Sequence, residues 1–200
     1  MCIAGQAPGQ RVHASGRSFT DASGARLRQW LAISEDDFYD PRKVAIVGMG
    51  FCFPGNDAKG GDLPPRRECA PAWRRELFSH LDSIELMILV GHHAQRWHLG
   101  SEYTAGGLAG TVMNWRRIYA SQHGRRTIPL PHPSWRNTGW LKRNPWFEAE
   151  LLPALRVEVA SILATEVVAP PLHRPDSAEG ERPSQCSRSG AGRDTDQAVR

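Results

Sequence analysis

Four short apolar runs, each containing β-branched residues, alternate along this chain with longer stretches of helical periodicity, and this alternation constrains the fold more than any other feature. The runs are "MCIAG" (residues 1–5), "KVAIVGMG" (43–50), "IELMILVG" (84–91) and "RRTIPLP" (125–131). Each has the length of a buried strand and ends at glycine or proline. Because strands that alternate with helices form parallel sheets covered on both faces, the pattern predicts a three-layer α/β/α sandwich with a four-stranded, mainly parallel central sheet.

The stretches between the runs predict the helices. Apolar residues recur there at intervals of three and four, and several stretches begin at a capping residue or end at glycine. The predicted helices cover 21–32, 69–81, 92–100, 112–124 and 144–163. We expect the last helix to bend at Pro153, because proline removes a backbone hydrogen bond. Four tryptophans fall on the apolar helix faces and are expected to be structural: Trp30, Trp73, Trp97 and Trp115.

The composition is that of one globular domain followed by a tail. The 200 residues are 40% apolar and 23% charged, and we expect residues 1–168 to form the folded part. Residues 169–200 are rich in Pro, Ser, Gly and charge, which predicts a disordered tail. We find no apolar run of membrane-spanning length, no secretory signal and no disulfide framework. A cytoplasmic monomer with no membrane partner is therefore expected.

A basic segment surrounds one histidine. Residues 103–147 contain seven Arg or Lys and no Asp or Glu. Near the middle of this segment, "LPHPSWRN" places His132 between Pro131 and Pro133, whose rings favour extended backbone and a stiff loop. A solvated surface is one interpretation of such a charge run. The second interpretation is a binding surface for phosphates, which the rigidly held histidine and the nearby tryptophans favour.

Two further loops are expected to lie beside His132. "GQAPGQRVHASGRSF" (5–19) follows the first predicted strand, and "GMGFCFPGNDAKGGDLPP" (48–65) follows the second. Loops that leave the carboxyl ends of parallel strands meet at one edge of the sheet, where ligands bind. Their glycines allow backbone N–H groups to approach an anion or a polarised carbonyl closely. The three loops therefore predict one shared site.

Four motifs in this order carry a family resemblance over roughly residues 2–160. They are "GQAPG" (5–9), "GRSFTDASGARL" (16–27), "VGHHAQRWHLG" (90–100) and "HPS" (132–134). They resemble "GEAPG", "GxPFxGxxGxxL", "LGxxAxxxLLG" and the third motif of the uracil-DNA glycosylase superfamily. The similarity is closest to its thermophile-type iron-sulfur branch, which is family 4-like, and to uncharacterised relatives of that branch.

The resemblance implies an enzyme of DNA base excision repair. Such an enzyme flips uracil or a related deaminated base out of DNA and hydrolyses the N-glycosidic bond, leaving an abasic site. Phe19 would be the ring on which the base stacks, and His132 would donate to the uracil O2 as negative charge builds on the leaving base. Gln6 would be the second catalytic residue. The other base-binding residues implied are Gly5, Ala7 and Gly48.

The residues after His132 are those expected to hold the DNA. Trp135 or Arg136 would fill the gap that the flipped base leaves, and Arg136 and Arg143 would bind phosphates. The full set of expected DNA-binding residues is Ser134, Trp135, Arg136, Asn137 and Arg143. Because Lys59 is the only lysine in the three loops and no motif supports a Schiff base, we expect a monofunctional glycosylase without a lyase step.

Two positions depart from the family pattern. Gln6 stands where the iron-sulfur branch has an acid, and an amide cannot act as a general base. Gly48 aligns with the asparagine of "NVVKC" that reads uracil. These departures keep open a catalytically inactive DNA-binding member of the same fold. A small-molecule nucleotide hydrolase is a second alternative, which the basic segment disfavours.

Two cysteines suggest part of a metal site. Cys52 and Cys69 have a spacing similar to that of the second pair of thiolates that hold the family's four-iron, four-sulfur cluster. The first pair would lie upstream of residue 1, so we expect that the chain lacks its natural start and that a longer form carries the cluster. Cys2 lies in the first predicted strand and Cys186 in the tail, and neither is a suitable replacement.

Overall fold

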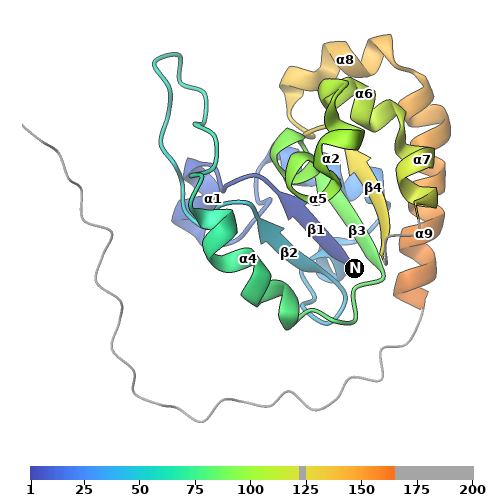
Figure 1. The fold of residues 1–200 in the computed structure, drawn as a ribbon, viewed down its shortest axis with the longest axis horizontal. Coiled ribbons are helices and arrows are strands. Elements are labelled where there is room, and N and C mark those ends of the chain that lie inside the picture. Colours follow the sequence, from blue (N-terminus) through green and yellow to red (C-terminus); the bar gives the residue numbers. More distant parts are fainter. Residues whose placement is uncertain (122–124, 165–200) are drawn as a thin grey trace, which may run out of the picture. The chain divides into compact units, whose positions relative to one another are not determined.

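The computed structural model describes residues 1–121 and 125–164. Its centre is one sheet of four strands in the order β2-β1-β3-β4, and every neighbouring pair is parallel (Figure 1). The strands are β1 (Cys2–Gly5), β2 (Ala45–Gly48), β3 (Leu86–Val90) and β4 (Arg126–Leu130). The predicted α/β class and all four predicted strands are confirmed. The tail at 169–200 lies outside the described residues.

The strands bury both of their faces. Ile3 pairs with Ile46 on one side and with Ile88 on the other, and all three point toward the larger core. The alternate side chains of β1 and β3, among them Ala4 and Leu89, point into a smaller core. Because successive side chains of a strand point to opposite faces, one apolar run supplies two cores. This explains why the strands lack alternating polar positions.

Helices on one face cover the larger core. This layer consists of α2 (Ala22–Leu31), α3 (Glu35–Phe38), α6 (Gly107–Met113), α7 (Trp115–Ala120), η2 (Phe147–Leu151) and α9 (Leu152–Ala164). Trp30 and Phe147 meet edge to face at 5.0 Å between ring centroids, which joins α2 to the C-terminal helices. The expected structural roles of Trp30 and Trp115 are confirmed, since both are buried.

The opposite face carries α4 (Cys69–Ser79) and α5 (His92–Thr104) (Figure 1). The prediction for Trp73 was wrong: its side chain is 58% exposed, while the neighbouring Arg74 is only 1% exposed. The guanidinium of Arg74 donates to the carbonyls of Val47 and Gly48, and these bonds allow a charged side chain to take the buried position. Trp97 is also 46% exposed, against expectation.

Two predicted helices have different bounds. α5 continues past Gly100 to Thr104, across a kink at which Gly100 adopts φ 72°. The helix expected over 112–124 is instead the pair α6 and α7, because the backbone leaves the helical conformation at Asn114. Its predicted end at Gly124 lies outside the described residues.

A π-helical segment opens the last predicted helix. η2 directly precedes α9, and Pro153 is the second residue of α9. A proline lacks the N–H that an α-helix needs and its ring collides with the preceding turn, so the wider π turn accommodates it. Both segments lie against the larger core, with Leu151 and Leu155 fully buried, and the bend at Pro153 stays a prediction.

Short helices lie in the loops at the carboxyl edge of the sheet. α1 (Gln10–Ser15) interrupts the first loop, and η1 (Trp135–Asn137) and α8 (Thr138–Arg143) follow the histidine loop. None of them was predicted. Within the described part of the chain, no helix is long and apolar enough to cross a membrane.

Candidate functional site

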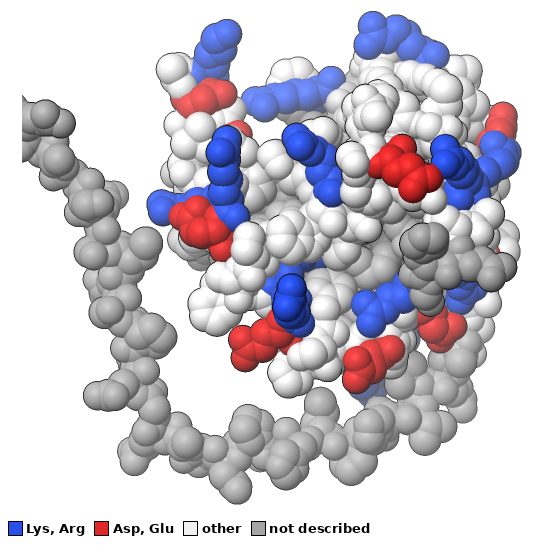
Figure 2. All heavy atoms as spheres, in the orientation of Figure 1, with Lys and Arg blue, Asp and Glu red and all other residues white. Residues whose placement is uncertain are grey.

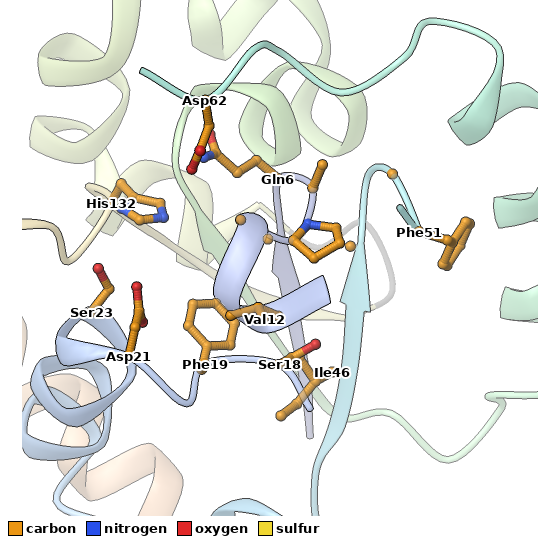
Figure 3. Close-up of a pocket in the computed structure, with 16 residues that line it drawn as sticks. Gln6, Val12, Ser18, Phe19, Asp21, Ser23, Ile46, Phe51, Asp62 and His132 are labelled. Carbon is orange, nitrogen blue, oxygen red and sulfur yellow. The ribbon is translucent and has the colours of Figure 1, made fainter. Parts of the chain in front are cut away.

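A pocket of about 180 Å³ lies beyond the carboxyl ends of β1 and β2 (Figure 3). Residues from all three predicted loops and from the start of α2 contribute to it. The lining comprises Gly5, Gln6, Ala7, Pro8, Gly9, Val12, Ser18, Phe19, Asp21, Ser23, Ile46, Gly48, Gly50, Phe51, Asp62 and His132. We call it the carboxyl-edge pocket. The structure thus brings together every residue predicted to be catalytic or base-binding.

His132 reaches the pocket from a loop that is fixed at several points. Pro131 and Pro133 are buried, and the side-chain amide of Asn137 donates to the His132 carbonyl at 2.7 Å. Gly91 lies beside His132, with a Cβ position 3.8 Å from the Cβ of His132, and its φ of 83° is one that glycine adopts without strain. The predicted stiff, non-helical loop is therefore confirmed.

The environment keeps the imidazole uncharged. Burial lowers the pKa of His132 below its ordinary value, and the carboxylates of Asp21 and Asp62 oppose this shift only in part. At neutral pH the ring is therefore neutral and carries one N–H donor. A neutral donor can bind a carbonyl oxygen without first attracting an anion.

A buried glutamine holds the base of the histidine loop, and sequence reasoning missed it. Gln95 is fully buried, and its amide donates to the carbonyl of Leu130 at 2.9 Å. The backbone N–H of Gly91 donates to the same carbonyl, also at 2.9 Å. The end of β4 is thus fixed two residues before His132. The surrounding sequence, "HHAQRWHLG", is itself mostly polar, so no local pattern distinguished this glutamine.

Phe19 lies in a strained and well-supported backbone position. Its φ is 59°, which side-chain-bearing residues rarely adopt. The hydroxyl of Tyr39 donates to the carbonyls of Ser18 and Phe19 at 2.8 and 2.9 Å. Gly24 permits this arrangement, since a Cβ there would lie 1.7 Å from the Phe19 carbonyl oxygen. Strain that neighbours stabilise in this way is typical of functional sites.

The ring of Phe19 forms one wall of the pocket. It lies against the backbone of Gly5, where a Cβ would sit 3.4 Å from the ring, and it meets Phe38 edge on. In Figure 3, Phe19, Asp21 and Ser23 lie at one end of the pocket, and Gln6 and Asp62 at the other, with His132 between them.

Gly48 has no room for a side chain. A Cβ at this position would lie 2.5 Å from the carbonyl oxygen of Gly50 and 2.8 Å from that of Gln6. The Gln6 carbonyl also accepts from the N–H of Met49 at 2.8 Å, so the loops after β1 and β2 are tied together here. The uracil-reading asparagine that aligns with Gly48 could not be placed on this backbone.

Two carboxylates in the pocket were missed by sequence reasoning. Asp62 belongs to a short hairpin, in which Asn56 pairs with Asp62 and the N–H of Leu63 donates to the Gly55 carbonyl at 2.9 Å. Its carboxylate faces Gly9, where a Cβ would lie 3.1 Å from it.

Asp21 is the second of these carboxylates and has another role as well. Its side chain caps α2 by accepting from the N–H of Gly24 at 3.1 Å. One of its oxygens is therefore committed to the helix terminus. The start of this helix at Asp21 was predicted, but a place in the pocket was not, because the sequence does not show toward which loops the start of α2 points.

The expected DNA-binding residues follow His132 on η1 and α8. Trp135 is 76% exposed, and the guanidinium of Arg136 lies 5.9 Å from its ring centroid. Arg143 is exposed, whereas Ser134 is half-buried and its carbonyl accepts from Arg26 at 3.1 Å. Asn137 supports the histidine loop. The backbone N–H groups of Gly61 and Lys59 lower the pKa of Asp57, and the charge of Arg136 adds to this shift, which indicates that η1 lies near the hairpin that carries Asp62.

The basic segment is less cationic than its sequence suggests. Arg116 and Arg117 form ion pairs of 2.7 Å with Glu150 and Glu102, and Arg126 pairs with both Glu85 and Glu158. Among the described residues, those of the segment without a salt bridge are Arg125, Arg136, Lys142 and Arg143, and all but the first lie on η1 and α8. Figure 2 shows basic and acidic side chains mixed over one face, with basic atoms along the edge where α8 lies in Figure 1.

The cysteines of the described chain do not fit a four-thiolate cluster. Cys52 is exposed, Cys69 is half-buried and Cys2 is buried in β1, and all three are free. Residues 1–121 and 125–164 contain no group of three or more His, Cys, Asp or Glu side chains placed to hold a metal ion. Cys186 lies outside the described residues.

A protein-family model matches most of this chain. The model of the uracil DNA glycosylase superfamily matches residues 1–156, which include all four strands and the whole carboxyl-edge pocket. The match does not distinguish among the branches of the superfamily. Because it covers more than half of the sequence, the chain belongs to the uracil DNA glycosylase superfamily.

Proposed function

We propose that this chain is a monofunctional DNA N-glycosylase that removes uracil or a related deaminated base. The observation that supports this most strongly is the carboxyl-edge pocket, in which Phe19, Gln6 and His132 meet although they come from separate motifs. By its motifs, the chain is nearest to the iron-sulfur branch. We further propose that it acts as a cytoplasmic monomer on single- or double-stranded DNA.

The residues of the pocket have complementary roles in breaking the bond. The flipped base stacks on the Phe19 ring, a contact that needs only the flat face of the base. As the N-glycosidic bond breaks, its electron pair moves onto the base. The neutral imidazole of His132 donates to the base carbonyl oxygen where this charge collects. Because the donor is fixed in advance, little reorganisation accompanies the step.

Asp62 is our candidate for activating water. Gln6 occupies the position of the family acid, and its amide can orient a water molecule but cannot accept a proton from it. The two carboxylates of the pocket are Asp21, which caps α2, and Asp62, which accepts a hydrogen bond from the Asn56 amide at 3.4 Å. Water adds its hydroxyl to the sugar carbon, and Asp62 takes the proton.

The two alternatives differ in how well the pocket suits them. A nucleotide hydrolase needs cations for the phosphates, and the lining of this pocket contains carboxylates but no Lys or Arg. An inactive DNA-binding relative is favoured by Gly48, which leaves no space for the asparagine that reads uracil. Such a protein would bind DNA without releasing a base.

The experiment that tests the proposal is uracil release from single- and double-stranded oligonucleotides that contain uracil. We expect release by the wild type and a fall of about a hundredfold in His132→Ala, the size typical of one lost oxyanion-type donor. His80→Ala is the matched control, since His80 is exposed beyond the end of α4. Circular dichroism establishes that all three proteins are folded.

Either of two results would contradict this assignment. A folded wild type that binds DNA but releases no uracil would favour the inactive relative. Equal rates for the wild type and His132→Ala would remove His132 from the mechanism.

A further inference from the structure

A second cavity, of about 560 Å³, is lined by residues of α4 and α5 and by residues at β3 and β4. It has the size of an ordinary small-molecule site. Its lining consists of Arg74, Arg75, Phe78, Met87, Trp97, His98, Arg125 and Thr127. We call it the α4/α5 cavity. It shares no lining residue with the carboxyl-edge pocket.

Arg74 is the least exposed residue of this lining, at 1%. One terminal nitrogen donates to the carbonyl of Gly48 at 2.8 Å, and the other contacts Nε2 of His98. Its Nε has no hydrogen-bond partner among the described residues. A buried donor without a partner is rare in folded proteins and calls for a missing acceptor.

No negative charge balances Arg74 in the described structure. The lining contains no Asp or Glu, and the described residues provide no salt bridge to this side chain. Burial lowers the pKa of Arg74 to about 10, so it still carries its charge at neutral pH. Burial also raises the pKa of the nearby Cys2 thiol to about 11, which keeps that group neutral. A buried charge without a counterion is unfavourable.

His98 contributes a neutral ring rather than a second charge. Burial, followed by the charges of Arg74 and Arg125, lowers the pKa of His98 to about 3. At neutral pH the imidazole therefore accepts a hydrogen bond from Arg74 and adds no charge of its own.

Two more guanidinium groups face the same space. Arg75 is exposed on α4, and Arg125 is half-buried just before β4, where it donates to the Leu81 carbonyl at 3.3 Å. The Phe78 ring lies between Arg74 and Arg125, at 4.8 and 5.9 Å from their guanidinium carbons. Three cations around one concave space favour a ligand with more than one negative charge.

We propose that the α4/α5 cavity binds the phosphate group of a small phosphorylated molecule through Arg74, Arg75 and Arg125. A phosphate presents several acceptor oxygens, which suits the fork geometry of the Arg75 and Arg125 guanidinium groups, while the buried charge of Arg74 adds electrostatic attraction. Trp97, which is 46% exposed in the cavity wall, offers a flat surface for a ring attached to that phosphate. The concave shape favours a small ligand over the backbone of a DNA duplex.

The test is a titration of the full chain with inorganic phosphate and, separately, with a nucleoside monophosphate. Sodium chloride keeps the ionic strength constant, and the unfolding temperature reports binding, because a ligand of the folded state stabilises it. We expect a saturable rise in the wild type. Arg125→Gln and Arg75→Gln should each weaken the apparent affinity by about tenfold, the effect of losing one charge-assisted hydrogen bond.

The matched control is Arg96→Gln, which removes the same charge from an exposed position on α5 beside Trp97 but outside the cavity. We expect it to bind phosphate as the wild type does. His132→Ala should also bind normally, since His132 belongs to the other pocket. This control separates the present proposal from the proposed glycosylase function.

Three outcomes would overturn the assignment. The first is the absence of any saturable response in the wild type at constant ionic strength. The second is an affinity that is unchanged in both Arg125→Gln and Arg75→Gln. The third is a loss of oligonucleotide affinity in Arg125→Gln without any binding of phosphate or of the monophosphate, which would assign the cavity to the DNA backbone.

Discussion

The carboxyl-edge pocket and the α4/α5 cavity belong to the same sheet but carry opposite kinds of charge. The first is lined by two carboxylates and a neutral imidazole, without Lys or Arg. The second is lined by three arginines without Asp or Glu. A fixed neutral donor binds a leaving base more strongly as negative charge develops on it, whereas a group of cations attracts a ligand that already carries negative charge. This contrast underlies the two proposals, chemistry in the first pocket and binding in the second.

The two sites meet at the end of β2. The carbonyl of Gly48 accepts from Arg74, while the same residue lines the carboxyl-edge pocket. Gly48 also has contacts too close for a Cβ. This strand end is therefore fixed from both sides. A buried arginine of α4 thus supports the backbone of the carboxyl-edge pocket.

The largest expected effect concerns the carboxylates of the carboxyl-edge pocket. We expect Asp62→Asn to lower uracil release by about a hundredfold, since a general base contributes at least that much to a reaction. The substitution preserves size and leaves the Asn56 contact available, so the free energy of unfolding should change little. Single-turnover release, with denaturation by urea as the check on folding, measures both quantities.

Asp21→Asn is the matched control. It removes the other carboxylate of the pocket but keeps the cap on α2, because asparagine caps helices as well as aspartate does. If Asp21→Asn were the slower variant and Asp62→Asn were fully active, the assignment of the base would have to be exchanged between them.

The second prediction concerns His98 in the arginine-lined α4/α5 cavity. The pKa of His98 is lowered from 6.5 to about 3 in the folded chain, so the unfolded chain binds a proton more readily between these values. The stabilisation by neutral His98 is therefore complete above about pH 6.5 and is lost as the pH falls toward 3. At pH 5 the loss amounts to about 2 kcal/mol of unfolding free energy.

We expect His98→Gln to remove this part of the pH dependence while keeping an acceptor for Arg74. Burial also lowers the pKa of His93 and of His132, so the variant should retain some slope. Urea unfolding at pH 7 and pH 5, in buffers without phosphate, gives the values. His80→Gln is the control. An identical loss in wild type and His98→Gln would show that burial and the neighbouring arginines do not lower the pKa of His98.

The strands and the pocket were the most predictable parts of the molecule. An apolar run such as that of β3 is buried on both faces whatever surrounds it, so the sequence alone suffices. Gln6 and Phe19 were implied by the family resemblance, whereas the meeting of their loop with the His132 loop followed from parallel strands, which bring their loops to one edge. Topology therefore predicted which loops meet, without any knowledge of distances.

The remaining site residues depend on tertiary contacts that no periodic pattern records. Asp62 reaches the pocket through a hairpin in an irregular loop, and a loop sequence does not show where a side chain points. Trp73 and Arg74 are neighbours on α4, and hydrophobicity favours burial of the tryptophan. Arg74 is buried instead, because it donates hydrogen bonds to the carbonyls at the end of β2.

The smallest expected effect concerns DNA binding beside the carboxyl-edge pocket. Arg136 forms no salt bridge in the described part of the chain, whereas Arg116 pairs with Glu150. If Arg136 binds a backbone phosphate, Arg136→Gln should lower the slope of log affinity against log salt by about 1 in magnitude. Arg116→Gln removes the same charge but should leave the slope nearly unchanged, because its guanidinium is already neutralised. Fluorescence anisotropy of a labelled oligonucleotide at several salt concentrations measures both slopes, and equal slopes in the two variants would show that the surface after His132 has no special part in holding the DNA.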